Sequence, residues 1–317
     1  MRQSRSPAQS PFAGYANAPF AVARRRRKVA YRVLLGALIV ACVAIAVFDS
    51  FVPHVRQVTV EVPGLARELR VLQITDLGSR RFGPRQSGLT RLVGAQRFDA
   101  VVLTGDMLSD DQRNSDRYQA VWDLADALRA NSDHLWYLRG NGDGGELGPS
   151  LVSHGVSNLP GAGAVPLDST DASATQVALV YGGSSASIAA AKGRGAKLLV
   201  IASHTPPDKH RLDAGRELGG GVHLFIAGHT HGGQIRLPLI GALAAPLSWL
   251  GEERVPVYGT ELTVLPDLRG RLVDGMYDRD GQKVFVSHGL DDRIIPFRFL
   301  ARVEMVEYRF VPVGAKP

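Results

Sequence analysis

His229 and His231, two histidines one residue apart, are the residues of this 317-residue chain whose placement most directly suggests chemistry. They lie in the sequence Gly-His-Thr-His-Gly-Gly, directly after the apolar run from Val222 to Ala227. This pattern predicts a buried strand that ends in a tight loop and directs two imidazoles to one point. Such crowding of imidazoles is useful for binding a metal ion or a phosphate group.

Four further apolar runs end in polar residues that can bind a cation, and they precede Asp76, Asp106, Asn141 and His204. Taken singly, the two aspartates could be helix N-caps and the asparagine a turn residue. The carboxyl ends of the strands of an open α/β sheet meet at one edge, where ligands bind. Together, the five strand ends predict a metal site at the carboxyl edge of a sheet.

The net charge of +7 is concentrated at one end of the chain. Residues 1–32 contain eight basic residues and no acidic one, which leaves 29 basic and 30 acidic residues in the remainder. The folded part therefore has no basic surplus that would attract a polyanion. We expect no nucleic-acid partner.

An apolar run, Val33–Phe48, follows the basic cluster and reaches membrane-spanning length when residues 30–32 are included. Basic residues before the run predict a single-pass anchor in the cell membrane, with the amino terminus cytoplasmic and the domain outside. Two alternatives are a signal peptide cleaved near residues 44–46 and a lipoprotein signal with Cys42 as the lipidated residue. Cys42 is the only cysteine, so no intrachain disulfide can form.

The expected organisation is a disordered basic segment over 1–28, a transmembrane anchor over 29–52 and one folded domain over 55–312. Strands alternate with helices predicted over 89–96, 118–130 and 184–191, which indicates an α/β fold. Residues 156–175 are rich in Gly, Pro, Ser and Asp and predict a loop. Strands over 283–287 and 303–311 are expected to close a second sheet.

In order, the motifs Asp76, Gly105-Asp106, Gly140-Asn141, His204 and Gly228-His229-Thr230-His231 resemble those of the calcineurin-like metallophosphoesterase superfamily. The stretches over 232–238 and 286–290 are similar to its membrane-associated bacterial branch. The resemblance covers residues 68–310. It implies a four-layer α/β/β/α sandwich with a two-metal centre between the sheets, preceded here by the N-terminal transmembrane helix. It also implies hydrolysis of a phosphate ester.

The resemblance assigns a role to each motif residue. Asp106 would bridge two metal ions, Asn141, His204 and His229 would complete one metal's shell, and Asp76 and His231 would bind the other. Two such ions neutralise the charge of a phosphoryl group and activate water. Mixed nitrogen and oxygen ligands suit one or two divalent transition metals, namely Mn, Fe, Zn or Co.

Two family histidines are replaced by glycine in this chain. The family's Asp-x-His motif is Asp76-Leu77-Gly78 here, and its Gly-Asn-His motif is Gly140-Asn141-Gly142. In the family, the second of these histidines protonates the leaving group or stabilises the phosphoryl oxygens. Losing a general acid typically costs about 10² to 10⁴ in rate. The remaining candidate catalytic residues are Asp106, Asp143 and His288. The loop that carries His288 would lie near the site in the family fold.

Three functions fit these departures: a phosphoesterase with an altered metal centre, a pseudoenzyme that binds metal, phosphate or a partner, and a purely structural membrane-anchored domain. The intact set Asp106, Asn141, His204 and His229 argues against the third, and between the first two the sequence leans modestly to the enzyme. The apolar stretch over 235–250 suits a phospholipid or a lipid-linked phosphate as substrate, although packing inside the fold explains it equally well.

Overall fold

The computed structural model describes residues 18–109, 116–132, 134–161, 163–167, 177–182, 189, 196–217, 222–245, 255–257, 260–264, 271–279, 281–292 and 296–314. The chain divides into two compact units, Met1–Ile45 and Ala46–Pro317. The boundary between them falls within the first helix.

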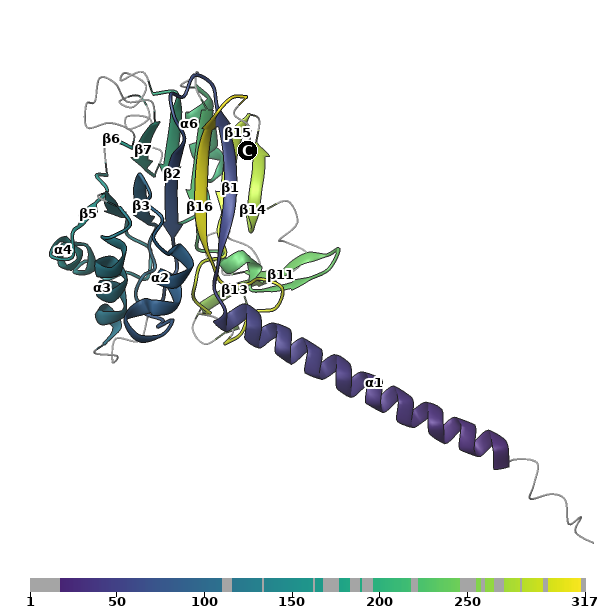
Figure 1. Cartoon of the computed structure of the whole chain (residues 1–317). Helices are drawn as coiled ribbons and strands as arrows, with labels where there is room; N and C mark the ends of the chain where they lie inside the picture. Colours follow the sequence, from purple (N-terminus) through teal and green to yellow (C-terminus); the bar gives the residue numbers. More distant parts are fainter. Residues whose placement is uncertain are drawn as a thin grey trace, which may run out of the picture. The chain divides into compact units, whose positions relative to one another are not determined.

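Helix α1 runs over Ala18–Phe51 and so begins upstream of residue 29, where the anchor was expected to start (Figure 1). Its segment Arg26–Phe51 is 26 residues long and contains an 18-residue window with a mean hydropathy of 2.5. That length and composition are sufficient to cross a membrane, and a signal sequence near the amino terminus has the same properties. Most of its apolar side chains are exposed.

The first sheet of the second unit has six strands in the order β1-β16-β2-β3-β4-β5. These strands are β1 (His54–Val62), β16 (Glu304–Pro312), β2 (Leu69–Ile74), β3 (Ala100–Leu103), β4 (Leu135–Tyr137) and β5 (Val156–Asn158). Strands β2 to β5 run parallel to one another. The prediction that residues 303–311 close the second sheet is wrong, because β16 pairs with β1 and β2 in the first sheet.

The second sheet also has six strands, in the order β14-β15-β9-β8-β7-β6. They are β14 (Gly275–Arg279), β15 (Gln282–Val286), β9 (Val222–Ala227), β8 (Leu198–Ala202), β7 (Val177–Tyr181) and β6 (Ala164–Pro166). Strand β15 is the predicted strand over 283–287. Strands β5 and β6 both lie within 156–175, so the predicted loop is wrong for these strands, and residues 168–175 lie outside the described part of the chain. The helix expected over 184–191 lies outside the described residues except at one position.

The two sheets pack face to face, and helices cover their outer faces. Val102 of β3 and Val200 of β8 belong to the apolar cluster between the sheets. The outer face of the first sheet packs against α2 (Ser87–Val93), α3 (Arg117–Leu128) and α4 (Leu147–Val152). The outer face of the second sheet packs against α6 (Lys209–Glu217) through Leu212. The predicted α/β/β/α layering is therefore confirmed.

A third, four-stranded sheet has the order β10-β11-β13-β12 (Figure 1). It comprises β10 (Ile235–Leu237), β11 (Gly241–Ala245), β13 (Thr260–Val264) and β12 (Val255–Val257). The first two strands use the apolar stretch after the Gly-His-Thr-His motif. In the turn between these two strands, Leu239 is fully exposed and Ile240 is half exposed.

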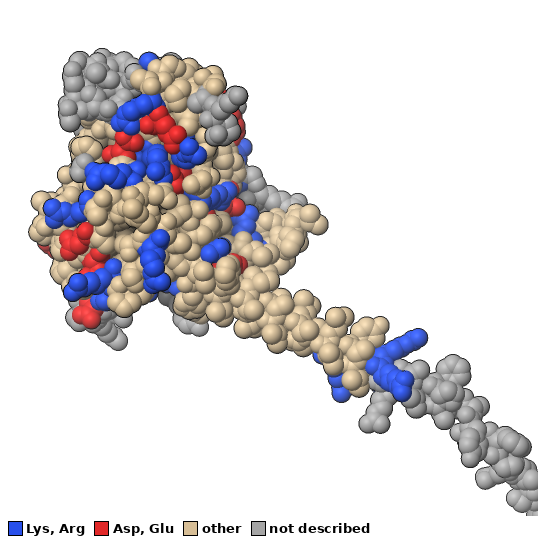
Figure 2. Space-filling model, viewed as in Figure 1, with Lys and Arg blue, Asp and Glu red and all other residues tan. Residues whose placement is uncertain are grey.

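Basic and acidic side chains are interspersed on the face of the second unit that Figure 2 shows. On α1, the described basic residues Arg26, Arg27, Lys28 and Arg32 are exposed and gather near its amino-terminal end. The described part of the basic cluster that precedes the apolar run in the sequence therefore lies on α1.

Candidate active site

The site lies where strands of both six-stranded sheets end. In the first sheet, Ile74 of β2 is in register with Leu103 of β3, so the two strands end together and deliver Asp76 and Asp106. In the second sheet, β8 and β9 run parallel and deliver His204 and His229. The loops that follow bring one carboxylate and two imidazoles from the two sheets to one point. The sequence-based prediction of a site at strand ends agrees with this placement.

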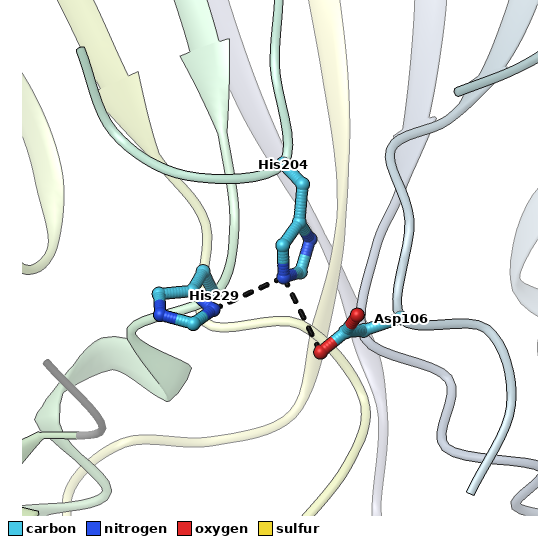
Figure 3. A group of neighbouring side chains, drawn as sticks. All are labelled: Asp106, His204 and His229. Atoms are coloured by element: carbon cyan, nitrogen blue, oxygen red, sulfur yellow. Dashed lines mark hydrogen bonds and ion pairs between the residues drawn. The ribbon is translucent and has the colours of Figure 1, made fainter. Parts of the chain in front are cut away.

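Asp106, His204 and His229 form a close, buried group (Figure 3). One ligand atom from each residue lies within 4.8 Å of the others. His204 Nε2 is 3.3 Å from Asp106 Oδ2 and 3.1 Å from His229 Nδ1. No more than 6% of any of the three residues is exposed. The donor set of carboxylate and imidazole, shielded from water, suits a divalent transition metal.

The loops that hold these residues use unusual backbone conformations. Asp76, Asp106, His229 and His231 all have positive φ angles, between 50° and 70°. Such conformations cost about 1–3 kcal/mol each and persist only where the surrounding structure imposes them. At Gly140 a Cβ atom would lie 2.1 Å from the Asp106 amide nitrogen, so only glycine allows this approach. The backbone is therefore shaped around the Asp106 carboxylate.

The Gly140–Asp143 loop orients Asp106 rather than adding a close acid group. The Gly142 N–H donates to Asp106 Oδ1 over 2.7 Å. Asp143 is buried and accepts hydrogen bonds from the Gly140 and Leu108 N–H groups and from the Tyr137 hydroxyl, all at 3.0 Å. These contacts fix the loop and use both carboxylate oxygens of Asp143. Asn141, between the two glycines, has an exposed side chain.

Asp76 and His231 form a second pair beside this group. His231 Nε2 is 3.8 Å from Asp76 Oδ1, and the Asp76 carboxylate accepts the His229 N–H through Oδ2 over 3.0 Å. Asp76 is 0% exposed, yet its Oδ1 has no hydrogen-bond partner among the described residues. A buried carboxylate oxygen without a partner is costly unless a cation binds it. This oxygen therefore also fits a metal ion.

The charges in the site favour a bound cation. Burial lowers the pKa of His204, but the hydrogen bond and the charge of Asp106 outweigh burial and raise this pKa to about 9. Burial raises the pKa of Asp76 to about 6, although the charge on His204 opposes the increase. The raised pKa of His204 reflects the negative charge of Asp106 and Asp76, which would equally attract a metal cation.

His288 lies beside this site but both of its ring nitrogens face other partners. Its Nε2 is 2.5 Å from Asp274 Oδ1, and its Nδ1 is 3.0 Å from the Arg302 carbonyl oxygen. A Cβ at Gly232 would lie 2.3 Å from the ring, so His288 packs against the loop that follows His231. This arrangement supports the loop and does not bring His288 into the Asp106 group.

Sequence reasoning missed Arg298, which is fully buried and ties the site loops together. Its guanidinium donates to the carbonyl oxygens of His231, His288, Asp291 and Ala301 and forms an ion pair with Asp292. The signal available in the sequence was a lone arginine within the apolar stretch over 294–300. A charge in such a stretch is buried only when it is paired.

The last turn of α1, which belongs to the second unit, is bonded to the same loop. The Arg298 N–H donates to Ser50 Oγ over 2.7 Å, and the Leu300 N–H donates to Asp49 Oδ2 over 2.6 Å. Asp49 and Ser50 are buried. The end of the helix is thus part of the framework that holds Arg298.

Comparisons with known proteins agree with this geometry. The model of the family described as calcineurin-like phosphoesterase matches residues 69–233, slightly more than half of the chain. The chain is 28% identical over 227 residues to the "Uncharacterized metallophosphoesterase YkuE" of Bacillus subtilis (strain 168), covering 68% of this chain and 69% of that protein. The matched range includes Asp76, Asp106, His204 and His229, the residues that the fold brings together. This chain belongs to the calcineurin-like phosphoesterase family and is a metal-dependent hydrolase of phosphoric esters.

Proposed function

We propose that this chain hydrolyses a phosphomonoester or phosphodiester at a metal centre held by Asp106, Asn141, His204 and His229, with Asp76 and His231 beside it. The observation that carries the proposal is the buried group of Asp106, His204 and His229, whose ligand atoms lie within 4.8 Å of one another. A divalent metal bound there would activate water and neutralise charge on the phosphoryl group.

The chain's own contacts prepare the ligand atoms for this role. His204 Nδ1–H donates to the Thr104 carbonyl oxygen over 3.0 Å, which leaves Nε2 directed at Asp106. Such a hydrogen bond fixes the ring orientation of a metal-binding histidine and raises its basicity. The Gly142 N–H fixes Asp106 from the opposite side through Oδ1. Asp106 and His204 are therefore oriented before any ion binds.

The altered positions limit the substrate. Gly78 and Gly142 carry no side chain that could bind metal or donate a proton, and His288 is engaged with Asp274. Without a general acid at these three positions, the leaving group would depart without being protonated by any of them. We therefore propose an ester with a leaving group of low pKa.

A second candidate function is that of a pseudoenzyme that binds metal, phosphate or a partner. The observation that favours it is the same absence of a proton donor at Gly142. The two functions differ in turnover, whereas both include metal binding.

Turnover of an aryl phosphodiester by the full-length chain in detergent separates the two candidates. We expect hydrolysis of bis(4-nitrophenyl) phosphate only when Mn²⁺, Fe²⁺, Zn²⁺ or Co²⁺ is added. Asp106→Asn should lower the rate at least about 100-fold, since even residues that only support a metal ligand contribute about 10–100-fold. Asp213→Asn, at a partly exposed position of α6 that pairs with Lys209 and Arg216, is the matched control. A parent without turnover that still binds inorganic phosphate would favour the pseudoenzyme.

We also propose that α1 is an uncleaved single-pass anchor, with its amino terminus in the cytoplasm and the hydrolase unit outside. The support is its apolar segment Arg26–Phe51 together with exposed basic residues near one end only. An alkaline phosphatase reporter fused after Pro317 should be active in cells. Activity of a β-galactosidase reporter at the same position would contradict this topology.

A lipid-linked phosphate is the substrate class that the surface supports. Exposed apolar side chains occur at the end of α1, in the β10–β11 turn and in the loop before β16: Phe51, Val52, Leu237, Leu239, Ile240, Phe297 and Leu300. These segments are continuous, because the Arg236 N–H donates to the Phe299 carbonyl oxygen and the Leu300 N–H donates to Asp49. An apolar surface next to a membrane helix suits contact with lipid.

Substitution of the β10–β11 turn tests the lipid proposal. Leu239→Ser with Ile240→Ser should lower turnover of a phospholipid presented in vesicles and leave turnover of bis(4-nitrophenyl) phosphate unchanged. Val152→Ser, on an exposed position of α4, is the matched control. Equal losses on both substrates would mean that the turn supports the fold and not lipid binding.

A further inference from the structure

The side chain of Asp291 fills the space next to the Cα atom of Gly78. Gly78 has a φ of +56°, and a Cβ built there would lie 2.2 Å from both Cγ and Oδ2 of Asp291. No side chain at position 78 is compatible with this placement of Asp291. The carboxylate thus occupies the region into which the second residue after Asp76 would project its own side chain.

The loop that carries Asp291 packs directly on Asp76 and His231. The Leu290 N–H donates to the Asp76 carbonyl oxygen over 3.1 Å. A Cβ at Gly289 would lie 2.7 Å from Asp76 Cβ, so the backbone approaches Asp76 closely. The carbonyl oxygen of Asp291 accepts a hydrogen bond from His231 Nδ1 over 2.8 Å. This bond leaves His231 Nε2 on the side of Asp76 Oδ1, 3.8 Å away.

Asp76 Oδ1 is the unsatisfied atom of this region. It is buried and has no hydrogen-bond partner among the described residues. Asp292, beside Asp291, pairs with Arg80 and Arg298 at 3.1 Å and 2.9 Å and so is occupied. A divalent cation would satisfy Asp76 Oδ1.

We propose that Asp291 supplies the ligand that Gly78 lacks, so that Asp76, His231 and Asp291 hold a second divalent cation beside the Asp106 group. This inference rests on the metal centre proposed above and adds a residue from a different loop. Exchange of an imidazole for a carboxylate makes the ligand set richer in oxygen, which suits Mn²⁺ better than softer ions. The second position should therefore prefer Mn²⁺ to Zn²⁺.

Metal stoichiometry tests the assignment without measuring activity. After equilibrium dialysis against Mn²⁺, elemental analysis of the full-length chain in detergent should give about two ions per chain, as in two-metal sites. Asp291→Asn should give about one ion, and the electron paramagnetic resonance signal of a coupled Mn²⁺ pair should disappear. Asp278→Asn, at an exposed position of β14, is the matched control and should retain both ions.

A reciprocal exchange provides the second variant. Gly78→His alone should collide with Asp291 and lower the thermal unfolding midpoint, whereas Gly78→His with Asp291→Gly should recover the parent midpoint and about two ions per chain. A parent that binds only one Mn²⁺, or an Asp291→Asn variant that keeps two, overturns the proposal. Metal-dependent turnover by a parent with one ion would leave the proposed function intact while removing this inference.

Discussion

The two sides of the metal centre are built in different ways. The Asp106 side consists of Asp106, His204 and His229, which follow parallel strands β3, β8 and β9 directly and lie within 4.8 Å of one another. The Asp76 side consists of Asp76, His231, Gly78 and Asp291, and it depends on loop 289–292 folding back onto Asp76. On the first side, the pairing of β8 with β9 aligns His204 and His229, and the packing of the two sheets brings Asp106 to them. Packing between loops fixes the second side. If Asp291 binds the second ion as proposed above, the comparison teaches that loss of a metal ligand is tolerated where a neighbouring loop can enter the space.

Removal of one ligand from the Asp106 side should have the largest effect. His229→Ala leaves the metal without one imidazole, and we expect its affinity to fall at least about 100-fold, above the 10–100-fold typical of residues that only support a ligand. Competition with a fluorescent zinc chelator would measure the change. His210→Ala, an exposed histidine of α6, should have no effect. Equal affinity in parent and His229→Ala would show that the two sides do not differ as described.

The Asp274–His288 ion pair, next to the Asp76 side, should contribute to stability in a pH-dependent way. Burial opposes ionisation of Asp274, but His288, Arg236 and Arg56 lower its pKa to about 2. A lowered pKa contributes stability above the unfolded value near 3.8, and this contribution is lost as pH falls towards 2. Asp274→Asn should therefore lower the free energy of unfolding by about 2 kcal/mol at pH 7. Urea unfolding should show a smaller difference at pH 3. A difference independent of pH would mean that packing dominates.

The two glycines should respond differently to substitution by histidine. Gly142 is not among the residues with positive φ, so a side chain is compatible with its backbone, whereas Gly78 is blocked by Asp291. Gly142→His should restore a proton donor beside Asp106 and raise turnover of an aryl phosphodiester at least about tenfold. Gly142→Ala controls for loss of backbone freedom. No gain in Gly142→His would indicate that the natural centre has another way to release the leaving group.

The smallest effect is expected where the Asp106 side is supported indirectly. Tyr137→Phe removes one of three hydrogen bonds to the buried Asp143 carboxylate. Loss of one such bond should cost about 1 kcal/mol in the free energy of unfolding. Chemical denaturation measures this cost, and metal affinity should change little. A large loss of metal binding in Tyr137→Phe would mean that Asp143 controls Asp106 more tightly than the geometry indicates.

The Asp106 side could be predicted from the sequence because its residues directly follow apolar runs. Ala100–Leu103, Leu198–Ala202 and Val222–Ala227 read as buried strands, and polar residues at their ends were expected to meet at a sheet edge. The resemblance of the ordered motifs then gave the fold and the chemistry. Local patterns of this kind carry no information about pairing between distant segments.

The errors follow from long-range pairing. Strand β16 was assigned to the wrong sheet because its partner β1 lies about 250 residues earlier, from His54 to Val62. Asp291 and Arg298 do not lie in any motif that the sequence analysis used. Their contacts with the site arise only because their loop packs on Asp76 and His231. His288 was expected near the site, and its partner Asp274 was not foreseen. Contacts of this kind depend on tertiary structure and leave no short-range signal.

The hydrogen bonds from the end of α1 to the Arg298 loop set a limit on proteolytic release of the enzyme. Cleavage near residues 44–46 would free a chain that still contains Asp49 and Ser50. Cleavage after Phe51 would remove the acceptors of the Arg298 and Leu300 N–H groups, at a cost of about 1–3 kcal/mol for each buried group left unsatisfied. A released protein that begins at residue 47 keeps the hydrogen bonds from Asp49 and Ser50 to the Arg298 loop. A released protein that begins at Val52 loses both of them.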